Sequence, residues 1–185
     1  TGVGTEMLDK EEIRRRGIPV YVNAGVNARS VAEHTLTLML ACLKRIPFID
    51  KQVRNGIWKK QETGTSCHEL YGKTVGLVGM GAIGRQVAEY LNVFGAKILY
   101  TDIYQLSPEQ EQKLNATYIP SFEEMLSQVD ILSFHCPLTN ENKEMLNEQT
   151  IAMMKSNATI INTARGKLIN ESALYHALKE KRISA

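Results

Sequence analysis

The sequence predicts an α/β fold, a doubly wound parallel sheet, and three observations indicate it. From Thr74 onward, short aliphatic or β-branched runs alternate with segments of helical length. Several of the short runs are apolar throughout, as expected of parallel strands that helices cover on both faces. Helix-start signals fall between the runs, which gives the order of a strand–helix–strand repeat.

The expected elements follow one another along the chain. The strands are residues 74–78, 97–101, 118–119, 131–134 and 159–161. Helices are expected to begin at residues whose side chains satisfy free backbone N–H groups. These starts are Ser30 with Glu33, Ser107 before Pro108, Ser121 with Glu124, and Asn170 ahead of the run 171–181.

Upstream of the sheet, a long helix is expected from Ser30 to about Trp58. Pro47 lies inside this stretch and should kink or interrupt it near Arg45, because proline lacks the N–H and clashes with the preceding turn. The polar, glycine-containing segment 55–73 is expected to be a surface loop that leads into the first strand.

Composition excludes several classes of protein. The net charge of the 185 residues is +2, too small to indicate a nucleic-acid or anionic-membrane partner. The longest apolar stretch, 36–43, is far shorter than the ~20 residues that cross a bilayer. The three cysteines have no metal-ligand spacing, so no metal site is expected, and free thiols favour a cytoplasmic location.

Residues 73–102 carry the strongest chemical signal. A strand ends at Gly79, the letters GMGAIG fit G-x-G-x-x-G, and a helix follows. Gly79 permits the tight turn, Gly81 lets a pyrophosphate approach the backbone, and Gly84 lets helix and strand pack closely. The helix N-terminus offers free N–H groups to the phosphates. Glycine-rich turns are common, but this context favours a dinucleotide site over a structural turn.

Asp102 closes the second strand of this unit. A carboxylate in this place binds the two ribose hydroxyls of NAD and repels the 2′-phosphate of NADP. The letters that follow, IYQLS, contain no arginine or lysine to accept such a phosphate. A plain turn residue is the alternative, but the position of Asp102 makes it less favoured, and the sequence predicts NAD.

Two later strands end in chemically distinctive residues. The letters HCP follow the strand 131–134, and NTARG closes the strand that begins at residue 159. Because ligands of a doubly wound sheet lie outside the carboxyl ends of its strands, both ends should face the cleft of the glycine loop. Arg165 would suit a small acid there, since its planar fork grips a carboxylate with two hydrogen bonds. From position alone, a solvated loop arginine remains open.

His135 has a structural interpretation as well as a functional one. A histidine at the end of a buried strand is more often hydrogen-bonded structure than a catalyst, and we interpret it as a wall of the cofactor site. Cys136 has no adjacent base in the sequence, which argues against nucleophilic catalysis.

With these residues in place, the chain resembles the D-isomer-specific 2-hydroxyacid dehydrogenases, the family that includes D-3-phosphoglycerate dehydrogenase. The resemblance covers essentially the whole sequence and rests on VNAGVNARSVAEHTL, GKTVGLVGMGAIGRQVA, HCPLT and NTARGKLINESAL. It implies a Rossmann NAD-binding domain in which Arg165 holds the carboxylate and carbonyl oxygen of the substrate. The positions that it implies along NAD are Thr1, Ala82, Ile83, Asp102, Cys136, Pro137, Thr163 and Ala164.

The resemblance also implies a domain organisation. Residues 1–22 would be the end of the substrate domain, and residues 23–185 the NAD-binding domain. The helix after Ser30 would contribute to a homodimer interface. Both ends look cut, because the chain opens without Met and stops just after the basic end of a helix. We therefore expect a truncated domain from a longer protein.

Two features depart from the family pattern. The letters NAG at 23–25 lack the usual proline, so the hinge between the domains is expected to differ. The family's acid–base histidine and its glutamate partner fall downstream of Ala185. Residues 1–185 alone are therefore expected to bind NAD and to catalyse nothing.

The function implied for the whole protein is an NAD-dependent oxidoreductase that moves a hydride between NAD(H) and a 2-hydroxy or 2-oxo acid. Phosphoglycerate, hydroxypyruvate, glyoxylate and lactate remain open, with a lean to 3-phosphoglycerate from VNAGVNARSVAEHT alone. One alternative is a non-enzymatic, NAD-sensing protein of the corepressor kind, although the sequence shows no long disordered tail. An enzyme that binds S-adenosylmethionine would leave the arginine of NTARG without a purpose.

Overall fold

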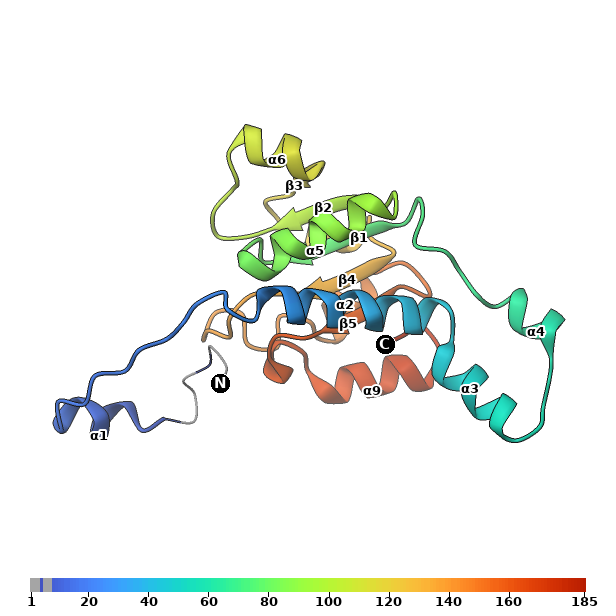
Figure 1. The fold of residues 1–185 in the computed structure, drawn as a ribbon, viewed down its shortest axis with the longest axis horizontal. Helices are drawn as coiled ribbons and strands as arrows, with labels where there is room; N and C mark the ends of the chain where they lie inside the picture. The colour runs from blue at the N-terminus through green and yellow to red at the C-terminus, as the bar shows by residue number, and fades with distance from the viewer. Residues whose placement is uncertain (1–3, 5–7) are drawn as a thin grey trace.

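The computed structural model describes residue 4 and residues 8–185. A five-stranded, all-parallel sheet in the order β3-β2-β1-β4-β5 forms its centre (Figure 1). The strands are β1 (Thr74–Val78), β2 (Lys97–Thr101), β3 (Ala116–Tyr118), β4 (Ile131–Phe134) and β5 (Thr159–Asn162). From β1 the chain adds β2 and β3 toward one edge of the sheet and then β4 and β5 toward the other edge. The strand order therefore reverses between β1 and β4, the point at which a doubly wound sheet binds its ligand.

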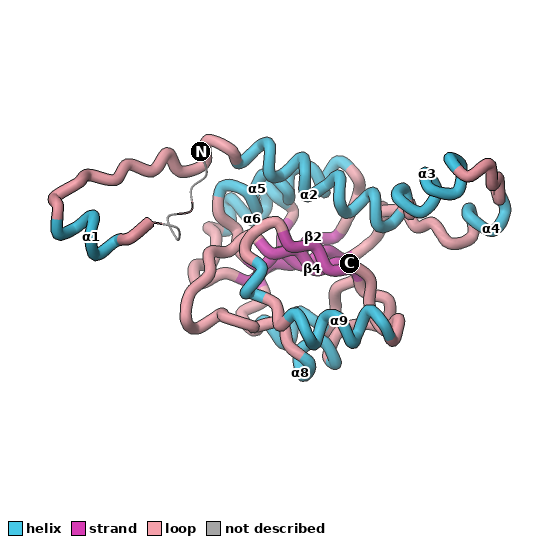
Figure 2. The backbone as a smooth tube through the Cα atoms, turned by 90° about the horizontal axis from the view of Figure 1, so that it is seen from below, coloured by secondary structure: helices cyan, strands magenta, loops and turns pink. Residues whose placement is uncertain are grey.

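Helices cover both faces of the sheet, which confirms the predicted fold class (Figure 2). The helices of the described residues are α1 (Lys10–Arg15), α2 (Ala28–Leu43), α3 (Ile46–Arg54), α4 (Lys60–Gly64), α5 (Ala82–Val93), α6 (Pro108–Leu114), α7 (Phe122–Leu126), α8 (Glu148–Ala152) and α9 (Glu171–Lys179), with a 3-10 turn at Gly166–Leu168. Helices α2 and α5 lie on one face, and α8 and α9 lie on the other.

The hydrophobic core therefore has two layers, one on each face. Alternate residues of a strand point to opposite faces, so β1, β2, β4 and β5 contribute to both layers. One layer includes Met39, Leu77, Val87, Leu91 and Tyr100, and the other includes Met125, Leu126, Leu132, Phe134 and Ile151. Burying one such side chain contributes about 1.5–3 kcal/mol to stability.

Three of the four expected helix starts are confirmed. Ser107 forms a capping box with Gln110 and is followed by the first-turn Pro108, while Ser121 and Asn170 each accept a backbone N–H of the helix that they begin. The start at Ser30 is wrong, because α2 begins at Ala28. Strand β3 lies two residues upstream of its expected start, and α9 ends at Lys179 rather than at 181.

The expected interruption near Arg45 is confirmed, but its form differs from a kink. Arg45 has a left-handed backbone (φ 52°), and it separates α2 from a new helix, α3. Pro47 falls in the first turn of α3, where its missing N–H would have had no partner in the helix. The Arg45 guanidinium lies 4.3 Å from the centre of the Phe48 ring, a cation–π contact across this break.

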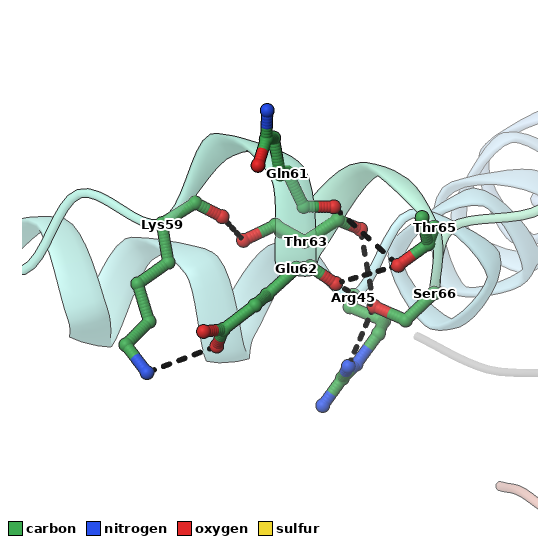
Figure 3. Close-up of polar contacts among 7 residues, drawn as sticks. All are labelled: Arg45, Lys59, Gln61, Glu62, Thr63, Thr65 and Ser66. Carbon is green, nitrogen blue, oxygen red and sulfur yellow. Dashed lines mark hydrogen bonds and ion pairs between the residues drawn. The ribbon is translucent and has the colours of Figure 1, made fainter.

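The segment 55–73 is not a plain loop, because it contains α4. Short local bonds hold this helix (Figure 3): Lys59 pairs with Glu62 at 2.9 Å, and the Thr63 and Thr65 hydroxyls donate to carbonyls of the preceding turn. The Arg45 Nη1 donates to Ser66 Oγ at 2.7 Å and so ties the end of α4 back to the end of α2. Helices α3 and α4 form an arm that stands away from the sheet (Figure 1).

The chain also extends away from the sheet at the other side of the molecule. Helix α1 stands apart there, joined to α2 by residues 16–27 without regular structure (Figure 1). After α9 the chain returns to the sheet, since Ser184 forms a parallel bridge with Thr159 beside β5. Within the described residues, none of the helices has the length and the hydropathy that crossing a bilayer requires.

Candidate functional site

A cavity of about 670 Å³ opens at the carboxyl ends of the strands. Parallel strands bring these ends to one edge of the sheet, so loops far apart in sequence meet there. The glycine loop, the end of β4 and the end of β5 all line the cavity, and so does the segment before α2. Nine of the expected site residues lie in its wall: Gly81, Ala82, Ile83, His135, Cys136, Pro137, Thr163, Ala164 and Arg165.

The three motif glycines have three different environments. Gly79 has φ +99°, and a Cβ on it would lie 2.8 Å from the backbone nitrogen of Cys136. A Cβ on Gly84 would meet the Gly79 carbonyl oxygen at 2.1 Å, so only glycine lets α5 approach the end of β1. A Cβ on Gly81 would have no atom within 4 Å. Gly81 thus borders open space, where a group from outside the chain can reach the backbone.

Asp102 lies behind the glycine loop and is held by it. Its Oδ2 accepts the backbone N–H of Met80 within the loop, and its Oδ1 accepts the backbone N–H of Tyr104 at 3.3 Å. A carboxylate has about four lone-pair positions, so both oxygens retain capacity to accept hydroxyl groups. The half-buried side chain is therefore oriented by two loops and still has room for a ligand.

The end of β4 places a neutral imidazole in the cavity wall. The Nε2 atom of His135 lies 3.0 Å from the hydroxyl of the fully buried Ser133, while Nδ1 is buried with no hydrogen-bond partner. Burial lowers the pKa of His135 to about 4, because the charged form loses its hydration. A histidine of this kind is neutral at physiological pH, which suits a wall better than acid–base work.

Cys136 follows His135 in the cavity wall, and its thiol has low reactivity. Burial raises the pKa of the thiol to about 11, so the reactive thiolate is scarce at neutral pH. The amide of Asn142 donates to the Pro137 carbonyl oxygen at 2.8 Å and approaches the Cys136 sulfur at 3.8 Å. This asparagine fixes the loop after β4, and it was not among the predicted site residues.

The end of β5 holds Arg165 at the cavity. The side chain of Asn162 accepts the Ala164 N–H at 3.0 Å and donates to the Arg165 carbonyl at 2.9 Å, which closes the turn on itself. Arg165 Nη1 donates to the Ala164 carbonyl at 2.9 Å. Thr163 is tied to Thr35 of α2. The guanidinium is thus carried by a short, internally bonded turn on a rigid strand.

Three expected residues lie outside the cavity wall. Gly79 and Gly84 shape the turn behind it, and Asp102 lies behind the glycine loop. Thr1 falls outside the described residues. The cavity is also lined by four residues that the sequence did not predict, Gly4 and, before or within the first turn of α2, Gly25, Asn27 and Val31. Gly25 belongs to the NAG stretch, from which the sequence predicts a hinge; it has φ +83° and packs toward the Cβ of Ala82.

Together the fold and the cavity define a nucleotide-binding α/β domain. Residues 36–185 match the family model of the D-isomer specific 2-hydroxyacid dehydrogenase, NAD binding domain. The chain belongs to this family, and NAD is the cofactor of its domain. The open space at Gly81, the N-terminus of α5 and the lone pairs of Asp102 fit that cofactor.

Three similar proteins illustrate the relationship. A glyoxylate reductase of Thermococcus litoralis is 40% identical over 183 residues, which are 96% of this chain and 55% of the relative. A D-3-phosphoglycerate dehydrogenase of Methanocaldococcus jannaschii is 38% identical over 185 residues, 100% of this chain and 34% of the relative. The crystal structure of D-lactate dehydrogenase from Aquifex aeolicus, complexed with NAD and lactic acid, matches with a TM-score of 0.87 at 34% identity and covers 100% of this chain and 54% of that one.

These comparisons confirm the family, the fold class and the cofactor that the sequence predicted. The chain spans between a third and about half of the length of these relatives. The non-enzymatic alternative finds no support in them, since each is named as an enzyme.

Proposed function

We propose that the protein is an NAD-dependent dehydrogenase that interconverts a D-2-hydroxy acid and the corresponding 2-oxo acid. The observation that supports this most directly is that Arg165 lines the same cavity as Gly81. A guanidinium can bind a carboxylate with two parallel hydrogen bonds, and here it lies in the same cavity as a nucleotide-binding loop. The cavity therefore suits a small carboxylic acid bound beside a cofactor.

We propose that the glycine loop and the first turn of α5 hold the pyrophosphate of NAD, with Gly79 and Gly84 shaping the turn. Asp102 receives the ribose hydroxyls. Further contacts to the cofactor are proposed at Ala82, Ile83, His135, Cys136, Pro137, Thr163 and Ala164, which line the cavity. A contact at Thr1, outside the described residues, is proposed from the family resemblance alone. When bound, NAD supplies or accepts the hydride.

Arg165 is proposed as the catalytic residue of this chain. Its guanidinium anchors the carboxylate of the substrate and stabilises negative charge that develops on the carbonyl oxygen. The proton for that oxygen needs a group with a pKa near neutrality, and His135, with its pKa of about 4, does not qualify. We infer that the acid–base group lies outside residues 1–185, as the family resemblance implies.

A test follows NADH absorbance in the full-length protein against 2-oxo acids that include glyoxylate, hydroxypyruvate, pyruvate and 3-phosphohydroxypyruvate, with NADPH in parallel. Turnover is expected with NADH and at least one acid. Arg165→Lys should lower kcat/KM by about 10- to 100-fold, because a point charge replaces a two-pronged, charge-assisted contact. Arg182→Lys is the matched control, because Arg182 is exposed and does not line the cavity.

Other results would change the assignment. NADH binding without turnover on any acid would favour the NAD-sensing protein, and absence of NADH binding would reject both. The relatives named for glyoxylate and phosphoglycerate make these two substrate classes the first to compare. A best rate with 3-phosphohydroxypyruvate would support the 3-phosphoglycerate assignment.

We further propose the domain division at residue 23 and a homodimer. Residues 8–22 stand apart from the sheet with α1, as the remnant of a second domain would. The arm of α3 and α4 exposes a set of large apolar side chains: Ile46, Phe48, Val53, Ile57 and Trp58. A second copy of the chain could cover this set, since exposed apolar patches mark interaction sites. The three free cysteines accord with a cytoplasmic protein.

The homodimer is tested by light scattering of the full-length protein. Phe48→Ser with Trp58→Ser should shift the mass toward the monomer, whereas Tyr175→Ser, at an exposed aromatic residue on α9, should leave it unchanged. A monomeric wild-type protein would reject the proposal.

A further inference from the structure

A fully buried tyrosine at the end of β2 reaches across to the loop that follows the strand. The Tyr100 hydroxyl donates to Glu111 Oε1 at 2.7 Å and accepts the backbone N–H of Leu106 at 2.9 Å. Gln105 Nε2 donates to the same glutamate oxygen at 3.0 Å. One phenol thus joins the end of the loop to α6.

The start of the same loop is held by a second tyrosine. The Tyr118 hydroxyl donates to the Asp102 carbonyl oxygen at 3.2 Å, and the Tyr118 ring lies 5.2 Å from the Tyr100 ring. Between these two anchors, Ile103 and Tyr104 are exposed and contribute little burial of their own. The two phenols therefore define the path of residues 102–106.

This path matters because it sets the direction of the Asp102 carboxylate. The Tyr104 N–H that binds Asp102 Oδ1 belongs to the anchored loop, and the Met80 N–H that binds Oδ2 belongs to the glycine loop. The carboxylate points in one direction only while both loops keep their positions. Release of residues 103–106 would remove one of the two bonds that orient it.

We propose that Tyr100 and Glu111 are positioning residues that give the protein its preference for NAD over NADP, by holding residues 102–106 so that the Asp102 carboxylate stays where a 2′-phosphate would lie. This inference rests on the proposed function of the cavity. Rejection of a phosphorylated ribose is a repulsive effect, and it is strong only when the repelling charge cannot move away.

The protonation states support a permanent link. Burial, with the hydrogen bond to Glu111, raises the pKa of the Tyr100 phenol, and the hydrogen bond from Tyr100 lowers the pKa of the Glu111 carboxyl. At neutral pH the phenol is therefore protonated and donates to an ionised carboxylate, and the direction of this hydrogen bond stays the same around neutral pH. A phenylalanine would fill the same core volume but would leave Leu106 and Glu111 without this link.

The experiment measures the dissociation constants of NADH and NADPH by fluorescence titration of the full-length protein. Tyr100→Phe is expected to lower the preference for NADH over NADPH by about three- to tenfold, since both hydrogen bonds of the hydroxyl, to Glu111 and from Leu106, are lost. Glu111→Ala, on the partly exposed surface of α6, should lower the same ratio without altering the core. Tyr90→Phe, at a partly buried tyrosine of α5, should leave the ratio unchanged.

A merely structural role would lower thermal stability in Tyr100→Phe and leave the ratio as in the wild type. An unchanged ratio of NADH to NADPH affinity in Glu111→Ala overturns the inference. This holds even if Tyr100→Phe does not fold, because Glu111→Ala removes the same link from the other side. The proposed function fails separately: it fails if the wild-type protein does not bind NADH or turns over no 2-oxo acid, whatever the variants do.

Discussion

The hydroxyl oxygens of Thr35 and Thr163 lie 3.0 Å apart and join α2 to the turn that follows β5. Thr35 is fully buried and donates its proton to the Val31 carbonyl at 2.8 Å. Because a hydroxyl has one proton, Thr163 is the donor of the bond between them. Arg165 follows two residues later, so the base of the proposed substrate-binding turn is fastened to a helix on one face of the sheet.

Thr35→Val should therefore lower the free energy of unfolding by more than the loss of an exposed hydroxyl on a helix surface does. The valine has the same shape but leaves the Thr163 hydroxyl without its acceptor, which costs about 1–3 kcal/mol when the group is buried. Urea unfolding measures the difference. Thr37→Val is the matched control, since Thr37 makes the same bond to the carbonyl four residues back but is exposed. Equal losses in the two variants would show that the Thr163 bond contributes nothing.

Alanine at two glycines of the motif should separate folding from binding. Gly84→Ala places a methyl group 2.1 Å from the Gly79 carbonyl and should lower the free energy of unfolding by about 1–3 kcal/mol. Gly81→Ala has no atom within 4 Å of the new Cβ, so its stability should stay within about 0.5 kcal/mol of the wild type. Its affinity for NADH should fall at least about tenfold, because the methyl group occupies the space that the pyrophosphate needs. Normal NADH binding by Gly81→Ala would place the phosphates elsewhere.

The sheet and the glycine loop could be predicted because their signals are local. The run ILSF of β4 is mostly apolar and is buried at every position. A Gly-x-Gly-x-x-Gly turn needs its glycines for reasons of space that hold in any protein. Helix starts were predicted where a side chain makes the cap, as at Ser107. The start of α2 was not, because its N-cap residue, Asn27, makes no side-chain bond to the helix.

The parts of the site that the sequence did not indicate depend on contacts between distant segments. Thr35 and Thr163 are 128 residues apart, and no local pattern pairs them. From the sequence, Tyr100 is an ordinary core residue of β2, and only the structure shows that its hydroxyl donates a hydrogen bond to Glu111 of α6. Short helix α4 was missed for another reason: its residues KQETG have no apolar face, and local bonds to Lys59 and Ser66 hold it instead.

Asp102→Asn should shift the cofactor preference toward NADPH. The amide loses the charge that repels a 2′-phosphate while its carbonyl oxygen can still accept the Met80 N–H, so the glycine loop should keep its shape. We expect the ratio of NADPH to NADH affinity to rise by about tenfold or more, measured by titration of both cofactors. Glu109→Gln, at an exposed carboxylate in the first turn of α6, controls for the change of net charge. An unchanged ratio would mean that Asp102 is a turn residue, the alternative that the sequence left open.

His135 should make the protein lose stability in mild acid. Its pKa is lowered by burial from 6.5 to about 4, so between these values the unfolded chain binds a proton that the folded chain does not. Stability therefore rises with pH across this window and levels off above about pH 6.5. Between pH 7 and pH 5 the loss from this one group should be about 2 kcal/mol.

The window from pH 5 to pH 7 isolates this imidazole from the carboxyl groups. Glu12, Glu111 and Asp130 have lowered pKa values in the folded state, so the stability that they contribute is lost only as the pH falls below 4.5 or 3.8, their values in the unfolded chain. Urea unfolding at pH 5, 6 and 7 should give a slope that His135→Gln removes and that His34→Gln, at an exposed histidine of α2, retains. If His135→Gln kept the wild-type slope, the buried ring would be protonated in the folded protein, and its place as a neutral wall of the cofactor site would be wrong.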